Sequence, residues 1–159
     1  MIAVNDKLLH IFLQENFGLL IVNRRLALRS YSNNPSGALG DLLSSLAAEL
    51  EGERAELEVT MRAAGVRPHR LKNLTLVTSE YLARLKLNGS LLSYSDLSRV
   101  YELHGLCLLT QHRIWLWRSL SALPAARGQA ERMEARAARQ LGDLESHRTA
   151  AMGRIVGAS

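Results

Sequence analysis

The chain has 159 residues, of which 47% are hydrophobic and 5% aromatic, with three prolines and a formal net charge of +5. This length and apolar fraction suit a single domain over residues 1–159 with one sizeable core, rather than two small domains. A composition rich in Leu, Ala, Arg and Glu favours helix, and a single cysteine, Cys107, excludes an internal disulfide framework.

The first predicted helix spans about residues 5–31 and the second about 35–64. Each has an apolar stripe at four-three spacing, typical of a helix-bundle seam. We expect Asn34 to cap the second helix, Pro35 to take its first position and Gly65 to end it. The stripes are Leu8, Phe12, Glu15, Leu19, Val22 and Leu26 in the first, and Leu39, Leu43, Leu46, Leu50, Glu53, Leu57 and Ala64 in the second.

One acid lies in the middle of each stripe, Glu15 in the first and Glu53 in the second. The midpoint of these two positions is residue 34, so a hairpin turning there would bring both acids to the same height inside the bundle. Buried carboxylates are costly unless they are neutralised, hydrogen-bonded or bound to a cation. The pair therefore predicts either a polar network or the relic of a metal site.

A long connection follows, with an amphipathic crossover helix expected at about residues 69–86 and ended by Asn88-Gly89. Two more long helices are predicted, at about 95–123, capped at Ser95, and at about 125–156. Two short links and one long crossover predict two antiparallel hairpins, with the third long helix parallel to the second. The sequence therefore predicts an all-α, ferritin-like four-helix bundle.

The helix at 95–123 is apolar nearly all round. If Glu102 and Arg113 mark its outer side, then His104, Gln111 and Trp115 face the bundle centre, together with Leu97 and Val100. Trp117 and several leucines would then lie near the outer side and need a cover. The crossover helix or the partner in a homodimer are both candidates for it.

Di-iron carboxylate bundles take one Glu from each of two helices and a Glu-x-x-His from each of the other two. Here Glu56, not a histidine, follows Glu53 at the third position, and the fourth helix offers Glu145 and Arg148, with His147 one residue out of place. A guanidinium repels a metal cation. We therefore favour a core polar network, a possible vestigial metal site, with no catalytic residue and no cofactor; the alternative is bound Fe or Mn. The residues concerned are Glu15, Glu53, His104, Gln111, Glu145 and Arg148.

The excess of positive charge makes nucleic acid a candidate partner. The arginines are dispersed, however, and on the last helix they alternate with acids as on a solvated face. Nucleic-acid binding is therefore not favoured. No leader or membrane span is expected, because polar residues interrupt the longest apolar runs, and with the lone cysteine this predicts a cytoplasmic protein.

Three segments together resemble an uncharacterised bacterial family of ferritin-like helical-bundle proteins. They are Arg84-Leu85-Lys86-Leu87-Asn88-Gly89, Leu97-Ser98-Arg99-Val100-Tyr101-Glu102-Leu103 and Leu116-Trp117-Arg118-Ser119-Leu120, and the stretch from Glu49 to Glu58 adds to the likeness. The resemblance implies a ferritin-like fold and brings no established activity. It also implies acids at the positions of His104 and Gln111, where this chain departs from the family.

These observations predict a non-catalytic binding or scaffold module that self-associates, or binds a protein partner, through the helix at 95–123. One alternative is a di-metal Fe/Mn carboxylate oxidoreductase or metal-binding protein, which needs the acids and His104 to converge. A second alternative is a basic nucleic-acid-binding bundle.

Overall fold

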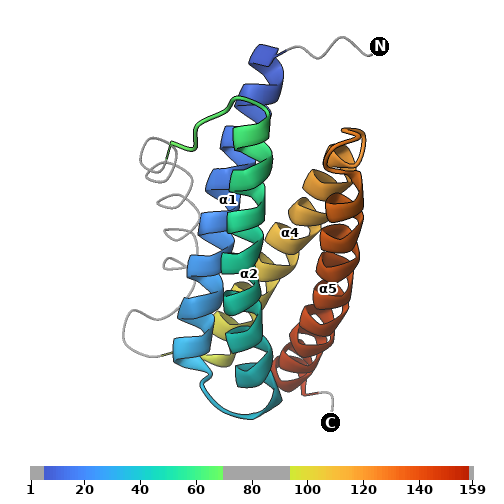
Figure 1. Cartoon of the computed structure of the whole chain (residues 1–159). Helices are drawn as coiled ribbons and strands as arrows, with labels where there is room; N and C mark the ends of the chain where they lie inside the picture. The colour runs from blue at the N-terminus through green and yellow to red at the C-terminus, as the bar shows by residue number, and fades with distance from the viewer. Residues whose placement is uncertain (1–5, 70–93, 158–159) are drawn as a thin grey trace.

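The computed structural model describes residues 6–69 and 94–157, and within these ranges the chain forms four α-helices and no strand (Figure 1). The helices are α1 (Asp6–Asn33), α2 (Gly37–Ala63), α4 (Asp96–Leu120) and α5 (Arg127–Val156). The predicted all-α class is confirmed, and the largest difference in helix bounds is the earlier end of α4, at Leu120. The expected crossover helix at 69–86 lies outside the described residues, apart from His69. None of the four helices is long and apolar enough to cross a membrane.

The four helices are arranged so that neighbours in contact run in opposite directions (Figure 1). Ser30, near the end of α1, bonds to Glu102, near the start of α4, whereas Asn16 in the first half of α1 bonds to His112 in the second half of α4. The hydrogen bonds between α5 and α2 show the same antiparallel order: Gln129 near the start of α5 bonds to Glu56, and Gln140 further along bonds to the earlier Glu49. Consequently α2 and α4 run in the same direction, as the connection lengths predict.

One continuous cluster of buried apolar side chains includes residues from all four helices. Its largest members are Trp117 of α4 and Phe17 of α1, surrounded by leucines that include Leu20, Leu50 and Leu57. Because burying one such side chain contributes roughly 1.5–3 kcal/mol, this cluster is the main stabilising term of the fold. The polar groups described below lie at its centre and edges.

The turn between α1 and α2 differs from the prediction. Asn34 closes α1 rather than opening α2, because its Nδ2 donates to Ser30 O (2.9 Å) and its backbone N–H to Tyr31 O (3.0 Å). Ser36 is the N-cap of α2, and Gly37 follows with a φ of +71°. The expected places of Asn34 as cap and Pro35 as first helical residue are therefore wrong, since the Asn34 amide satisfies the end of the preceding helix.

The predicted end of α2 at Gly65 and the predicted start of α4 at Ser95 are confirmed. Gly65 has a φ of +72° and donates to Arg62 O, while Val66 N–H donates to Met61 O, which together form a Schellman motif. At the start of α4, Ser95 accepts from the backbone N–H of Ser98 in a capping box. Local cap chemistry therefore fixes these two ends independently of the packing.

Gly40 is the point at which α2 passes closest to the preceding turn. A Cβ at this position would lie 2.7 Å from the carbonyl carbon of Pro35 and 2.9 Å from Asn34 O. Both are backbone atoms, which cannot turn away as a flexible side chain can. We expect Gly40→Ala to lower the free energy of unfolding by about 1–2 kcal/mol in urea denaturation, because the clash outweighs the better helix propensity of alanine.

Gly52 is the matched control for this substitution. It lies in the interior of α2, is exposed, and a Cβ there meets no atom within 4 Å. Gly52→Ala should therefore raise the free energy of unfolding by up to about 1 kcal/mol. Equal stabilisation by both alanines would contradict the close approach at Gly40.

Candidate functional site

The six residues predicted to form a core polar network are not brought together. Glu53 is buried, as its stripe predicts, but Glu15, His104 and Glu145 are exposed. Gln111 and Arg148 are half-buried. Among residues 6–69 and 94–157, no group of three His, Cys, Asp or Glu side chains is placed to hold a metal ion.

Glu15 does not face Glu53, because the buried face of α1 is rotated from the predicted one in its first half. Its neighbours Gln14 and Asn16 are buried instead. Gln14 donates from Nε2 to Arg67 O (2.6 Å) and accepts from the backbone N–H of His69 (3.1 Å). Asn16 Oδ1 lies 2.8 Å from His112 Nε2. Amide side chains with partners on other segments therefore take the inward positions, and the predicted pair of facing acids does not exist.

The orientation of α4 is also opposite to the prediction. Glu102 and Arg113, expected on the outer side, are both 2% exposed, and Trp117 is fully buried. His104, Leu97 and Trp115, expected at the centre, are exposed, whereas Val100 is buried as expected. The reason is that both charged residues find partners inside the bundle, so their charge does not force them toward water.

Glu53 and Arg113 form a buried ion pair between α2 and α4. Arg113 Nε donates to Glu53 Oε1 (2.9 Å), and its Nη2 donates to Oε2 (2.5 Å), the two-pronged geometry in which a guanidinium binds a carboxylate best. Trp117 Nε1 also donates to Glu53 Oε1 (2.6 Å). Arg113 Nη1 is buried and has no hydrogen-bond partner in the described part of the chain. The acid thus has three donors, while one nitrogen of the guanidinium is unsatisfied.

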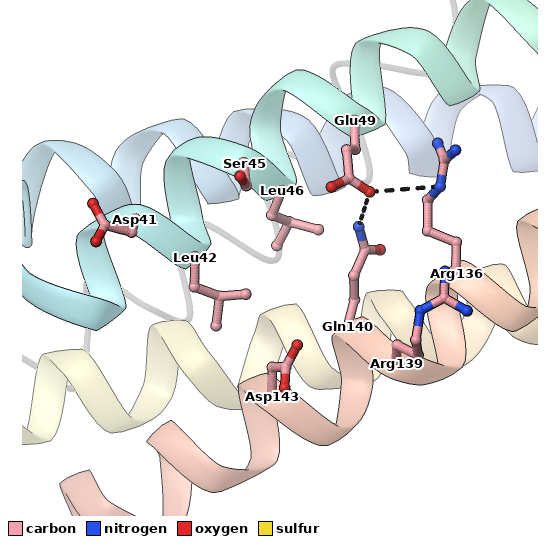
Figure 2. A pocket seen from close by; sticks show the side chains of 9 residues that line it. All are labelled: Asp41, Leu42, Ser45, Leu46, Glu49, Arg136, Arg139, Gln140 and Asp143. Carbon is pink, nitrogen blue, oxygen red and sulfur yellow. Dashed lines mark hydrogen bonds and ion pairs between the residues drawn. The ribbon is translucent and has the colours of Figure 1, made fainter.

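Gln140 of α5 connects this pair to the surface. Its Oε1 accepts from Arg113 Nη2 (2.8 Å), and its Nε2 donates to Glu49 Oε2 (2.8 Å), which also faces Arg136 Nε at 3.6 Å. Figure 2 shows Gln140 reaching from α5 toward Glu49 of α2, which also faces Arg136. A chain of polar contacts therefore runs from the core to the outside.

These outer residues line an open groove of about 610 Å³ between α2 and α5 (Figure 2). Its charged residues are the acids Asp41 and Glu49 of α2 and Arg136, Arg139 and Asp143 of α5, so no single charge dominates. Ser45 is its only hydroxyl, and no histidine lines it, so the groove has no nucleophile and base pair. The lining residues are Asp41, Leu42, Ser45, Leu46, Glu49, Arg136, Arg139, Gln140 and Asp143.

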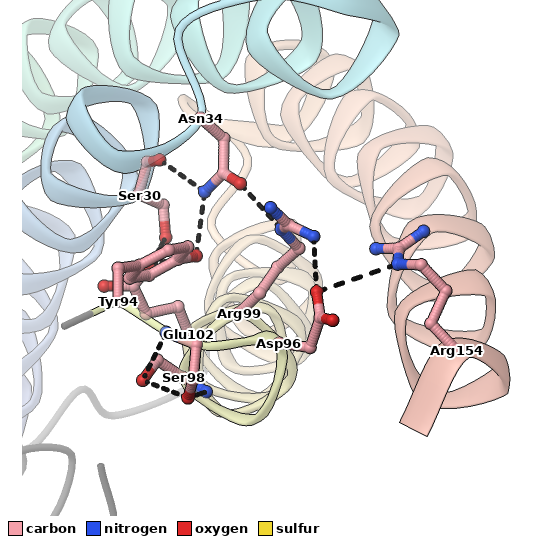
Figure 3. A network of polar contacts seen from close by, with 9 residues as sticks. Ser30, Asn34, Tyr94, Asp96, Ser98, Arg99, Glu102 and Arg154 are labelled. Atoms are coloured by element: carbon pink, nitrogen blue, oxygen red, sulfur yellow. Dashed lines mark hydrogen bonds and ion pairs between the residues drawn. The ribbon is translucent and has the colours of Figure 1, made fainter. Parts of the chain in front are cut away.

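A second buried acid, Glu102, is the centre of another network, near the start of α4 (Figure 3). Its Oε2 accepts from Ser30 Oγ and Tyr94 OH, both at 3.0 Å. Its Oε1 accepts from Asn33 Nδ2 (3.0 Å) and lies 3.1 Å from Arg29 Nε. Both oxygens of the Glu102 carboxylate are therefore bound by two partners each, and these contacts join the end of α1 to the start of α4.

The pKa of the Tyr94 phenol is raised in the folded protein. Burial, with the Glu102 carboxylate acting in the same direction, raises the pKa of Tyr94 to about 12, against 10.0 for the free side chain. The neutral phenol is therefore favoured in the folded state, and its contribution to stability is complete below pH 10 and is lost between about pH 10 and 12. We expect ultraviolet absorbance to show one tyrosine that ionises late, and Tyr94→Phe to remove it; loss of a tyrosine with an ordinary midpoint would contradict the network.

Cys107 and His112 are the remaining nucleophile and base candidates, and neither is activated. Burial raises the pKa of the Cys107 thiol, with Glu145 acting in the same direction and Arg148 against it. Burial lowers the pKa of His112, whose Nε2 is occupied by Asn16. A reactive cysteine needs a lowered pKa and access to solvent, so Cys107 is a structural residue.

The side of α4 that faces away from the bundle has a row of large side chains at four-three spacing. We call it the outer stripe: Leu97, Tyr101, His104, Leu108, Gln111, Trp115 and Arg118. Leu108 is 54% exposed, Trp115 55% and Tyr101 38%. The inward-facing side of the same helix has a second row with equal spacing, composed of Leu103, Leu106, Thr110, Arg113, Trp117 and Leu120. Because the two rows have equal spacing, periodicity cannot choose between them, and the charges of Glu102 and Arg113 pointed to the wrong one.

Comparison with known proteins finds no matching family model, no matching curated protein and no matching solved structure. The family resemblance of the sequence segments therefore stays a prediction. Any functional conclusion has to come from the geometry of this chain itself.

Proposed function

We propose that this chain is a non-catalytic, ferritin-like helical-bundle module that self-associates through the outer stripe of α4. The observation on which the proposal depends is the exposure of Tyr101, Leu108 and Trp115 on one helix face. Aromatic side chains on a rigid helix are the residues that most often dominate protein interfaces. Exposing these apolar side chains to water is unfavourable, and this favours association with a second copy that covers them.

The ferritin-like assignment is supported by the chain directions. Contacting helices are antiparallel, and α2 and α4 run in the same direction on opposite corners of the bundle. That order requires a connection between α2 and α4 long enough to return along the bundle.

The buried chemistry favours a structural role over catalysis. Among residues 6–69 and 94–157 the buried acids are Glu53 and Glu102, and each is bound by an arginine and by neutral donors of other helices. Such networks specify how helices fit together. The Fe/Mn alternative requires Glu15, Glu53, His104 and Glu145 to converge, and three of these four point to solvent.

Nucleic-acid binding gains no support from the surface charges. Several arginines are already paired with acids: Arg24 with Glu51, Arg118 with Glu134, and Arg62 with Glu58. Pairing of this kind lowers the positive potential that would attract phosphates.

Self-association is tested by size-exclusion chromatography with light scattering. We expect a mass near twice the 17.6 kDa of one chain at high concentration. Leu108→Glu should return the protein to a monomer, because it places an unpaired charge in the apolar contact. A wild-type protein that is monomeric at every concentration would refute the proposal.

Val59→Glu is the matched control. Val59 is on α2 and is 56% exposed, close to the 54% of Leu108, but it lies outside the outer stripe. The control variant should associate as the wild type does. Loss of association in both variants would show that added negative charge, and not the stripe, is responsible.

A further inference from the structure

The outer stripe is nearly symmetric about Leu108. Tyr101 lies seven residues before Leu108 and Trp115 seven residues after it. His104 lies four residues before and Gln111 three residues after. The row therefore reads aromatic, polar, leucine, polar, aromatic in both directions along the helix.

A pattern of this kind fits a two-fold axis perpendicular to the helix. In a two-fold interface the same patch is used by both copies, so residue i of one copy meets residue j of the other and the reverse. Two antiparallel α4 helices with the axis near Leu108 bring Tyr101 of each copy opposite Trp115 of the other. Offset or edge-to-face contacts between such rings stabilise an interface beyond the area that they bury.

The charges at the two ends of the stripe agree with this direction. Asp96 at the start of α4 is 53% exposed in its side chain, and Arg118 near its end is 63% exposed. Each already has an ion-pair partner in its own chain, Arg99 for Asp96 and Glu134 for Arg118, so their contribution to a contact is small. An antiparallel contact places these opposite charges at the same end, whereas a parallel contact places Asp96 opposite Asp96 and Arg118 opposite Arg118. Like charges at a contact are unfavourable.

We propose that two copies of this chain associate through antiparallel α4 helices, with the two-fold axis passing close to Leu108. This inference rests on the proposed self-association and specifies its geometry. The polar pair His104 and Gln111 then lies on either side of the axis, where an imidazole nitrogen and an amide can hydrogen-bond across the interface. A uniformly apolar stripe would allow the two helices to slide, and these polar residues limit the contact to one register.

Distances between spin labels test the direction. Ser119 is exposed, lies beside the stripe and does not belong to it. A nitroxide at Ser119→Cys, in a Cys107→Ala background, should lie about 33 Å along the helix from its copy in the antiparallel pair, at 1.5 Å per residue. In a parallel pair the two labels would be separated mainly by the helix spacing of roughly 8–10 Å and the label arms.

A mixing experiment gives an independent test. Leu97→Cys and Ser119→Cys, each in the Cys107→Ala background, should be cross-linked by a short bismaleimide when the two proteins are mixed. Neither variant should cross-link efficiently on its own, because in the antiparallel dimer position 97 of one copy lies opposite position 119 of the other and far from position 97. The Cys107→Ala parent without added cysteine is the blank.

The outcomes separate this geometry from self-association in general. A dimer by light scattering whose Ser119 labels lie under about 20 Å apart is parallel and overturns the register. A dimer with neither the expected distance nor the mixed cross-link uses another surface and also overturns it. A monomer in light scattering refutes the proposed function itself.

Discussion

Replacing Glu53 with leucine should lower the free energy of unfolding by roughly 3–5 kcal/mol, the largest effect that we expect of a single substitution in this chain. The substitution leaves the Arg113 guanidinium buried, with Gln140 as its only hydrogen-bond partner in the described part of the chain. The free-energy cost of a buried, unpaired charge is far larger than the stabilisation gained by burying the apolar surface of the new leucine. Urea denaturation followed by far-ultraviolet circular dichroism, at one fixed protein concentration, measures the change.

The double variant Glu53→Leu with Arg113→Met separates the worth of the pair from the cost of breaking it. Removing both charges also removes the unsatisfied Arg113 Nη1. We expect the double variant to lose about 1–3 kcal/mol, less than Glu53→Leu alone, because apolar replacements of buried ion pairs are often neutral but this one leaves the buried Trp117 Nε1 donor without its acceptor.

The exposed pair Arg118–Glu134 is the control for this cycle. Its N–O distance of 2.7 Å is similar, but the Arg118 side chain is 63% exposed. Glu134→Gln should therefore cost less than about 1 kcal/mol. If Glu53→Leu costs no more than this control, the Glu53 carboxylate does not pair with Arg113 in the interior.

Glu102→Ala should lower the free energy of unfolding by about 2–3 kcal/mol, the second largest effect. Of its four partners, Arg29 and Asn33 reach water and can be hydrated after the substitution. Ser30 is buried and Tyr94 is half-buried, so their hydroxyl groups lose an acceptor that water replaces poorly. Leaving a buried donor unpaired costs roughly 1–3 kcal/mol. The same urea titration measures the loss.

Asp96→Ala is the comparison for Glu102. Asp96 lies at the same end of α4 and has two arginine partners, Arg99 at 2.8 Å and Arg154 at 3.8 Å, but its side chain is 53% exposed. We expect a loss below about 1 kcal/mol from this variant, because exposed pairs are screened. Equal losses from the two variants would mean that Glu102 is hydrated in solution and that its network is not formed.

Helix class, helix ends and chain directions follow from local chemistry and connection lengths, which the sequence displays. Gly65 and Ser95 end and begin helices because of their own backbone and side chain, so they were predictable. Asn34 was not, because its amide can either accept from the N–H groups that open the next helix or donate to a carbonyl that ends the preceding one, and the structure shows the second.

The interior of the bundle was much harder to predict. On α1 the stripe is correct at Val22 and Leu26 but not at Leu8, which is 61% exposed. On α4 the charges of Glu102 and Arg113 indicated the outside, although Arg113 lies in the middle of the row that contains Leu106 and Trp117. That position, an arginine amid the largest apolar residues of the helix, was the available signal for a buried pair. Its acid partner is 60 residues away in sequence, so no local pattern could identify it.

Trp115 and Trp117 are two residues apart and differ completely in environment, since Trp115 is exposed and Trp117 is enclosed beside Glu53. The chain therefore has two intrinsic fluorophores with separable emission. A water-borne quencher such as iodide should reach the indole of Trp115 and leave that of Trp117 bright. A change in Trp115 emission on dilution would then report dissociation of the two copies, and a change in Trp117 emission with denaturant would report unfolding. One sample can therefore follow both association and unfolding.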